Sequence, residues 1–123
     1  MIQRYQDLRV YQEAYRLAIL LHKKTLNFPD IERRELGSQI RRAATSIPAN
    51  IAEGYGRKNS ASEFKHFLRN ALGSGNEVRV FIDMAKDLGY IASEEHEELS
   101  QAYEALGKQL YRLIEAWQKR SEV

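Results

Sequence analysis

Residues 35–58, ELGSQIRRAATSIPANIAEGYGRK, form the stretch that decides the fold. Apolar residues recur in it at steps of three and four, a spacing that places them on one face of an α-helix. These residues are Leu36, Ile40, Ala43, Ala44, Ile47 and Ile51. The opposite face carries small residues in place of the long charged side chains of an ordinary solvated face: Ser38, Thr45, Ala49 and Ala52. Either a second copy of the chain approaches this face closely, or the face is exposed and its alanines simply favour helix.

Pro48 stands inside this pattern, where a proline removes one backbone hydrogen bond and costs roughly 3 kcal/mol. Two interpretations follow. One helix kinks at Pro48, or one helix ends near Thr45 and another begins with Ser46 as its cap. We favour a kinked continuous helix, because the apolar stripe keeps its phase from Ile47 to Ile51.

Polar and small residues follow the proline. Asn50 lies at the margin of the apolar stripe, and a polar group there needs partners such as freed backbone carbonyls, so we expect it to tie one helix to another. Glu53 is the best candidate for a functional carboxylate, but we interpret it as holding the kinked segment or a subunit contact. Gly54 and Gly56 are expected to end the helix.

The rest of the sequence predicts three helices in addition to the stretch already described, and these are the first, third and fourth in chain order. The first covers residues 7–26 with Asp7 as its N-cap. Two apolar stripes cover more than half of its circumference, whereas packing within one bundle needs a stripe somewhat wider than about 100°. The excess indicates contact with a neighbouring subunit, unless the tyrosines lie at the rim of the core with wet hydroxyls. The second helix is the stretch already described, over residues 31–54.

The third helix is expected to follow a capping box formed by Ser60 and Glu63 and to run to residue 88, where Gly89 closes it. Gly73 and Gly75 interrupt it, which indicates close approach of another helix at Ala43 and Ala44. Ser93 is expected to cap the fourth helix, whose core residues again recur at steps of three and four. The sequence therefore predicts an all-α, antiparallel up-down-up-down four-helix bundle with a kinked second helix.

Composition agrees with one globular domain over residues 1–123. The chain is 43% hydrophobic and 29% charged, and it holds no cysteine, which excludes disulfides and thiolate chemistry. No run approaches the roughly 20 apolar residues of a membrane span. The first ten residues lack the apolar core of a signal peptide. We therefore expect a cytoplasmic, bacterial-type protein with no membrane contact.

The most specific motif is SIPANIAEG, residues 46–54, with LGSQIRRAA before it and SEFKHFLRNALGS after it. These segments resemble the family of four-helix-bundle proteins encoded in intervening sequences of bacterial 23S rRNA genes. The resemblance extends from QDLRVYQEA to the last helix, and Gly75 departs from it, since the family has a bulky apolar residue there. Accessory proteins of diversity-generating retroelements look like relatives of this family.

The residues indicate no catalytic, metal or cofactor site. The three histidines fall on three predicted helices, outside any zinc-ligand spacing. Glu63 and His66 have the Glu-x-x-His spacing of di-metal bundles, but a second such pair is missing from the sequence, and Glu63 is assigned to the capping box. We therefore expect a protein that is not an enzyme.

Basic residues are the remaining functional candidates. A nucleic-acid-binding role is predicted for seven of them, with a tyrosine beside them: Arg34, Arg41, Arg42, Arg57, Lys58, Lys65, Arg69 and Tyr55. Arginine forks match phosphate oxygens, each neutralised phosphate releases counterions, and a tyrosine ring can stack on an unpaired base. The alternative is a set of surface salt bridges with Glu35, Glu63 and Asp83.

Charge is divided unequally along the chain. Residues 1–92 hold 15 Lys and Arg against 10 Asp and Glu, whereas residues 93–123 hold 4 against 7. This dipole either steers an anionic partner to the first three helices or guides one subunit onto another. A third interpretation is that both regions are merely solvated.

Two functions remain in view. The first is a non-enzymatic, oligomeric RNA- or nucleoprotein-binding module. The resemblance implies a ring-like homopentamer that associates with structured RNA or with a reverse-transcriptase complex. The second is a protein-interaction scaffold, for example a reverse-transcriptase accessory protein, without direct contact to nucleic acid.

Overall fold

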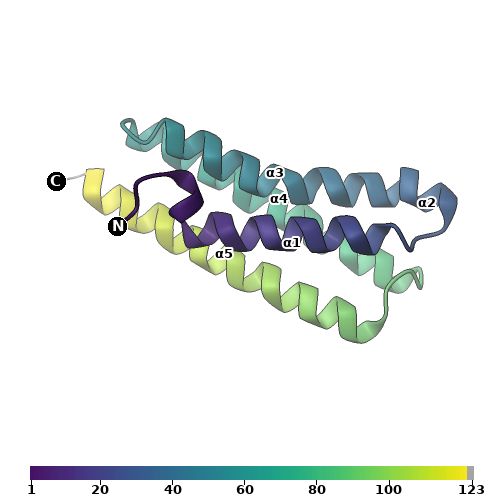
Figure 1. Ribbon diagram of the computed structural model, residues 1–123. Helices are drawn as coiled ribbons and strands as arrows, with labels where there is room; N and C mark the ends of the chain where they lie inside the picture. The colour runs from purple at the N-terminus through teal and green to yellow at the C-terminus, as the bar shows by residue number, and fades with distance from the viewer. Residues whose placement is uncertain (122–123) are drawn as a thin grey trace.

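The computed structural model describes residues 1–121, with side chains up to residue 117, and these residues form helices and turns without a strand. Three long helices and a shorter one run antiparallel, so that the N-terminus and the end of α5 lie at the same end of the molecule (Figure 1). The elements in chain order are η1 (Tyr5–Asp7), α1 (Arg9–Thr25), α2 (Asp30–Arg34), α3 (Leu36–Gly56), α4 (Ala61–Asp87) and α5 (Ser93–Ser121). The predicted four-helix bundle is confirmed, with α2 and α3 together forming its bent second member.

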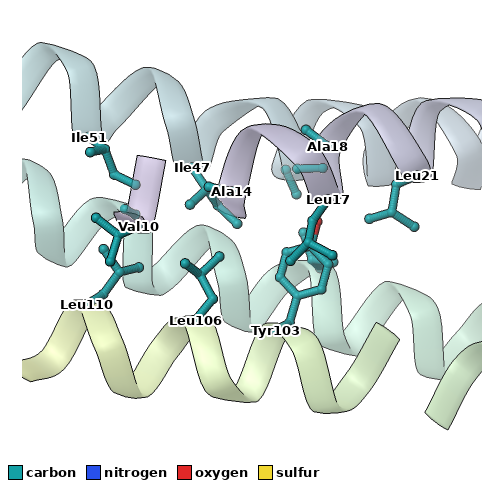
Figure 2. Packing of buried hydrophobic residues seen from close by; sticks show 14 of the residues in the cluster. Val10, Ala14, Leu17, Ala18, Leu21, Ile47, Ile51, Tyr103, Leu106 and Leu110 are labelled. Carbon is teal, nitrogen blue, oxygen red and sulfur yellow. The ribbon is translucent and has the colours of Figure 1, made fainter. Parts of the chain in front are cut away.

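The helices pack in sequence order around one core. α3 lies between α1 and α4, α4 packs against α5, and α1 meets α5 along a shorter seam. Figure 2 shows side chains from α1, α3 and α5 meeting in this core: Val10, Ala14, Leu17, Ala18 and Leu21 from α1, Ile47 and Ile51 from α3, and Tyr103, Leu106 and Leu110 from α5. Because burying one Leu or Ile contributes roughly 1.5–3 kcal/mol, this interior is the main stabilising element of the fold.

The second member of the bundle is interrupted at Glu35, whose backbone (φ −97°, ψ −92°) is not helical. The prediction of one uninterrupted helix over residues 31–54 is therefore wrong at this point. α3 continues through the buried Pro48, so the choice of a continuous helix over two helices meeting near Ser46 is confirmed. The interruption is spanned by hydrogen bonds from Arg41, which are described below.

Glycines in α3 and α4 differ from their predicted roles. Gly56 is the last residue of α3, as expected, but Gly54 is buried inside the helix. A Cβ on Gly54 would lie 2.8 Å from Phe67 Cβ and 3.1 Å from Phe64 Cδ1, so this glycine lets α3 approach α4. Gly73 faces open space. The close approach of α3 and α4 therefore lies at Gly54, and its prediction at Gly73 is wrong.

The predicted role of Gly75 is wrong as well. We expected this glycine to let α4 pack closely against Ala43 and Ala44. α4 is continuous through its glycines, and a Cβ on Gly75 would meet only Ile47 Cδ1, at an ordinary 3.9 Å. The glycine is therefore not required there by a neighbouring helix. Periodicity reveals which residues face the core, but it does not say how closely two backbones approach.

Two of the predicted N-caps are also placed differently. Asp7 ends η1, and its carboxylate accepts hydrogen bonds from the backbone amides of Gln3 (3.0 Å) and Arg4 (3.3 Å). α1 begins two residues later. Ser93 is the first residue of α5, and the Ala92 amide before it donates to the Glu95 carboxylate at 3.0 Å.

The caps of α4 agree better with expectation. The Ser60 hydroxyl accepts a hydrogen bond from the Glu63 amide at 3.3 Å, whereas the Glu63 carboxylate turns away from the predicted capping box toward Arg57. Gly89 adopts φ +83° after α4, and the Tyr90 amide then donates to the Ala85 carbonyl at 2.8 Å. This left-handed glycine is the expected helix stop.

Candidate nucleic-acid interface

The eight predicted site residues do not form one cluster. Arg34 ends α2 and Arg42 lies in the second turn of α3, whereas Arg57 and Lys58 lie in the turn between α3 and α4. α3 has 21 residues, and at 1.5 Å per residue it is about 30 Å long. The α3–α4 turn lies at the opposite end of the molecule from α2 (Figure 1). The candidates therefore form two separate basic regions.

Arg41 has an internal role. Its Nη1 donates to the hydroxyl of Thr25 at 2.8 Å, and its Nη2 donates to the backbone carbonyl of Arg33 at 2.8 Å. Thr25 is completely buried and donates in turn to the His22 carbonyl. A single guanidinium thus joins α1, α2 and α3 at the bend, which gives Arg41 a structural function whether or not it contacts phosphate.

Tyr55 is a core residue rather than an open stacking platform. Its ring is 9% exposed and meets Phe64 edge-on, with the two centroids 6.3 Å apart. The ammonium of Lys58 lies 4.0 Å above the Tyr55 ring. A base could stack on that face only after the lysine moves away, so the two residues form one cation–π pair.

Arg57 forms surface salt bridges, which were the alternative to nucleic-acid binding. Its guanidinium approaches the carboxylates of Glu63 at 3.2 Å and Glu53 at 3.6 Å, and it lies 5.4 Å from the centroid of the Phe67 ring. Glu53 therefore supports the end of α3, in line with the structural role expected of it. Exposed pairs of this kind contribute between 0 and about 1 kcal/mol.

Four of the candidates have no acidic partner among the residues whose side chains are described: Arg34, Arg42, Lys65 and Arg69. The predicted salt bridges with Glu35 and Asp83 are not formed by these cations. Asp83 instead pairs with His96, whose Nε2 lies 2.6 Å from its carboxylate. The uncompensated charges are located on α2, α3 and the first turns of α4.

The SIPANIAEG motif links α3 to α4. The Ser46 hydroxyl hydrogen-bonds the Ser74 hydroxyl of α4 at 2.8 Å. The Asn50 amide donates to the Ser46 hydroxyl at 2.9 Å and to the Ser46 carbonyl at 2.8 Å. The prediction that Asn50 ties one helix to another is therefore wrong, because its own bonds stay within α3 and the bond between helices belongs to Ser46.

Two of the hollows beside α3 contain residues that the sequence analysis singled out. A polar hollow of about 420 Å³ lies between α3 and α4, and we call it the α3–α4 hollow. Its lining residues are Arg34, Glu35, Ser38, Gln39, Arg42, Ala43, Ser46, Ser74, Glu77 and Phe81. An apolar groove of about 430 Å³, the α1–α3 groove, is lined by Tyr5, Tyr11, Tyr15, Ala18, Ile19, His22, Thr45, Pro48, Ala49 and Ala52. The small residues that were singled out in the sequence therefore line both hollows.

Within the side chains that the structure describes, no group of three His, Asp or Glu side chains could hold a metal ion. Glu63 of the Glu-x-x-His pair contacts Arg57, and His66 lies edge-on to Phe67, with ring centroids 5.4 Å apart. None of the helices within residues 1–121 combines the length and apolarity that a membrane span requires.

The fold defines the chain as an antiparallel four-helix-bundle protein. Residues 6–112 match the model of the 23S rRNA-intervening sequence protein family, and the chain belongs to that family. It is also similar to a crystal structure from Bacteroides thetaiotaomicron, described as a protein of unknown function from the S23 ribosomal protein family. That similarity has a TM-score of 0.74 and 27% identity, and it covers 85% of this chain and 97% of the other. None of the curated proteins matches the chain.

Proposed function

We propose that this protein is a non-enzymatic, homo-oligomeric module that binds structured RNA. The observation that carries the proposal is that four of the candidate cations, on α2, α3 and the first turns of α4, have no acidic partner in the described part of the chain: Arg34, Arg42, Lys65 and Arg69. Unpaired cations bind phosphates at low cost, because no internal ion pair has to break first. The family's name, which refers to sequences within 23S rRNA, agrees with such a partner.

Self-assembly is the second part of the proposal. The α1–α3 groove is apolar, and a row of tyrosines borders it, with the Tyr5 and Tyr11 centroids 4.9 Å apart and the Tyr11 and Tyr15 centroids 5.9 Å apart. Tyr15 is 53% exposed and Ile19 is 42% exposed. Burial of this groove by another copy agrees with the ring-like homopentamer that the family resemblance implies. A ring also presents each basic surface several times, which increases affinity for a long RNA.

The test is the salt dependence of RNA binding. A variant in which the four unpaired cations are replaced by glutamine should bind a structured rRNA fragment more weakly. The slope of log affinity against log salt should become shallower by about 3, since each phosphate contact contributes roughly 0.7 to 0.9. The matched control removes four other exposed cations: Arg9, Lys23, Lys86 and Arg112. Equal losses in the two variants would show that only net charge matters, and the proposal would then be wrong.

The second candidate function is a scaffold that binds a partner polypeptide without contacting nucleic acid, as a reverse-transcriptase accessory protein would. The observation that favours it is a second apolar surface on α4, where Val80, Met84 and Leu88 are about half exposed and lie four residues apart. A complex with a defined protein partner that survives nuclease treatment and is lost in Met84→Lys would support this function over RNA binding.

A further inference from the structure

We propose that the α3–α4 hollow is a nucleotide-binding subsite that takes one nucleoside monophosphate unit. In this arrangement the phosphate lies on Arg34 and Arg42, and the base lies against Phe81. Where the unit belongs to an RNA chain, the inference rests on the function proposed above, since it says how one unpaired nucleotide is held. The same chemistry fits a free nucleotide, and the experiment below separates the two sources.

The phosphate end of the hollow is formed by the bend of the chain. Arg34 ends α2 and Arg42 follows in α3, so the interruption at Glu35 brings both guanidinium groups to the same hollow. Neither arginine has an acidic partner among the described side chains, and both are exposed. In addition, no side chain caps the N-terminus of α3, and the positive end of its helix dipole lies at this hollow. These features together favour an anionic group.

The base end of the hollow lies toward α4. Phe81 is half-buried, so part of its ring remains open to the hollow that it lines. The Ser46 and Ser74 hydroxyls, joined by their 2.8 Å hydrogen bond, lie in the same wall. Aromatic rings stack on unpaired bases with little sequence preference, and hydroxyls can accept or donate toward a ribose or a base edge.

The acidic residues of the hollow favour a nucleotide over a bare phosphate. Glu35 and Glu77 also line it, and neither forms an ion pair with the two arginines. Two carboxylates weaken the binding of a free inorganic anion, but they accept hydrogen bonds from N–H groups on a base. A nucleotide carries both an anionic group and such donors. The volume of about 420 Å³ lies within the range of about 300–1,000 Å³ that is usual for ligand sites.

The experiment measures calorimetric binding of GMP, AMP, CMP, UMP and inorganic phosphate to the full chain. A second arm measures binding of a short single-stranded RNA that has no secondary structure. The variants are Arg42→Gln and Phe81→Leu, with Arg112→Gln on α5 as the matched control and Phe81→Tyr as the variant that keeps a stacking ring. Thermal unfolding of each variant confirms that it is folded.

We expect nucleotides to bind more tightly than inorganic phosphate. Arg42→Gln and Phe81→Leu should each weaken nucleotide binding by about tenfold or more, as expected for the loss of a charged hydrogen bond or a stacked base. Arg112→Gln should bind as the unchanged protein does, and Phe81→Tyr, which keeps an aromatic ring, should lose less affinity than Phe81→Leu. The inference is wrong if no nucleotide binds in either arm, or if the hollow variants lose no more affinity than Arg112→Gln.

The two proposals fail separately. If structured RNA binds in the salt-dependent way described above but Arg42→Gln and Phe81→Leu bind as the control does, the hollow is not a nucleotide subsite and the RNA-binding function stands. If free nucleotides bind with the expected losses but no structured RNA binds, the hollow is a site for free nucleotides, and the RNA-binding function is wrong.

Discussion

Arg41 reaches from α3 across the start of its own helix to the buried hydroxyl of Thr25 at the end of α1, at a distance of 2.8 Å. The same guanidinium also spans the bend, since its second bond goes to the carbonyl of Arg33, near the end of α2. Gly37 makes room for it, because a Cβ there would lie 3.1 Å from Arg41 Nη1 and 3.0 Å from the Glu32 carbonyl oxygen. The bend at Glu35 is thus stabilised by one side chain that satisfies acceptors on two other helices.

The first prediction concerns this guanidinium. Arg41→Ala should lower the free energy of unfolding by about 1.5–3 kcal/mol, because charged hydrogen bonds are lost and Thr25 keeps a buried hydroxyl with one partner fewer. Arg42→Ala is the matched control, because the guanidinium of Arg42 is exposed and has no ion-pair partner in the described structure. This variant should change stability by less than about 0.5 kcal/mol. Urea unfolding at one fixed protein concentration measures both variants. Equal effects would contradict the structural role of Arg41.

The second prediction is a reversal of sign between two glycines. Alanine favours helix over glycine by about 1 kcal/mol, so Gly73→Ala, which points into open space, should stabilise the protein by up to that amount. Gly54→Ala should destabilise it by about 1–3 kcal/mol, because its Cβ would lie 2.8 Å from the Cβ of Phe67. Denaturation midpoints for the two variants provide the measurement. A Gly54→Ala variant as stable as the unchanged protein, or more stable, would mean that α3 and α4 are not in tight contact at Gly54.

The third prediction concerns the seam between α1 and α5. The Tyr103 hydroxyl is buried and has no hydrogen-bond partner in the described part of the chain, and burial raises the pKa of Tyr103 because the phenolate would lose its hydration. Tyr103→Phe should therefore leave stability unchanged or raise it by about 1 kcal/mol. Tyr90→Phe is the opposite case, because the Tyr90 hydroxyl donates to the Glu32 carboxylate at 2.8 Å, and the loss of this hydrogen bond should lower stability. A stability loss in Tyr103→Phe would reveal a partner for its hydroxyl.

The fourth prediction concerns acid. The side-chain hydrogen bond from Lys24 (2.6 Å) and the amide of Ala92 both hold the pKa of Glu95 below its ordinary value. A lowered carboxyl pKa contributes stability that is complete above the unfolded value, near pH 4, and is lost as the pH falls through the folded value. The Glu95 side chain is 42% exposed, so solvent screening limits this contribution to less than about 1 kcal/mol. Glu95→Gln should remove that part of the acid dependence when unfolding is followed from pH 7 to pH 3, and an unchanged profile would contradict it.

Helix periodicity is enough to predict the bundle, because residues three and four positions apart lie on the same face of a helix and can be buried together. Val10, Ala14 and Leu17 illustrate this, since they follow one another at steps of four and three and all three are buried. The bend at Glu35 follows no such rule. Gly37 leaves room for the guanidinium that spans the bend, but the bonds that hold it come from Arg41, which is distant from Thr25 in sequence.

The candidate site was predictable only in part for the same reason. Positive charge on the first three predicted helices is visible in the sequence, but the pairing of Arg57 with Glu63 and of Lys58 with the ring of Tyr55 depends on the turn between α3 and α4. The α3–α4 hollow exists only once α4 places Phe81 beside α3. Glu77 could not have been singled out, because an exposed glutamate on a helix is ordinary.

The last prediction concerns assembly through the α1–α3 groove. Tyr15→Glu places a charge on an apolar surface that a second copy is proposed to bury, so this variant should sediment as single copies of 14.3 kDa under conditions in which the unchanged protein forms a larger species. Tyr111→Glu is the matched control, because Tyr111 is 56% exposed against 53% for Tyr15 and lies on α5, outside the groove. Sedimentation at micromolar concentration provides the measurement. Loss of assembly in Tyr111→Glu alone would place the contact on α5, and a folded single-copy species of the unchanged protein would exclude self-assembly.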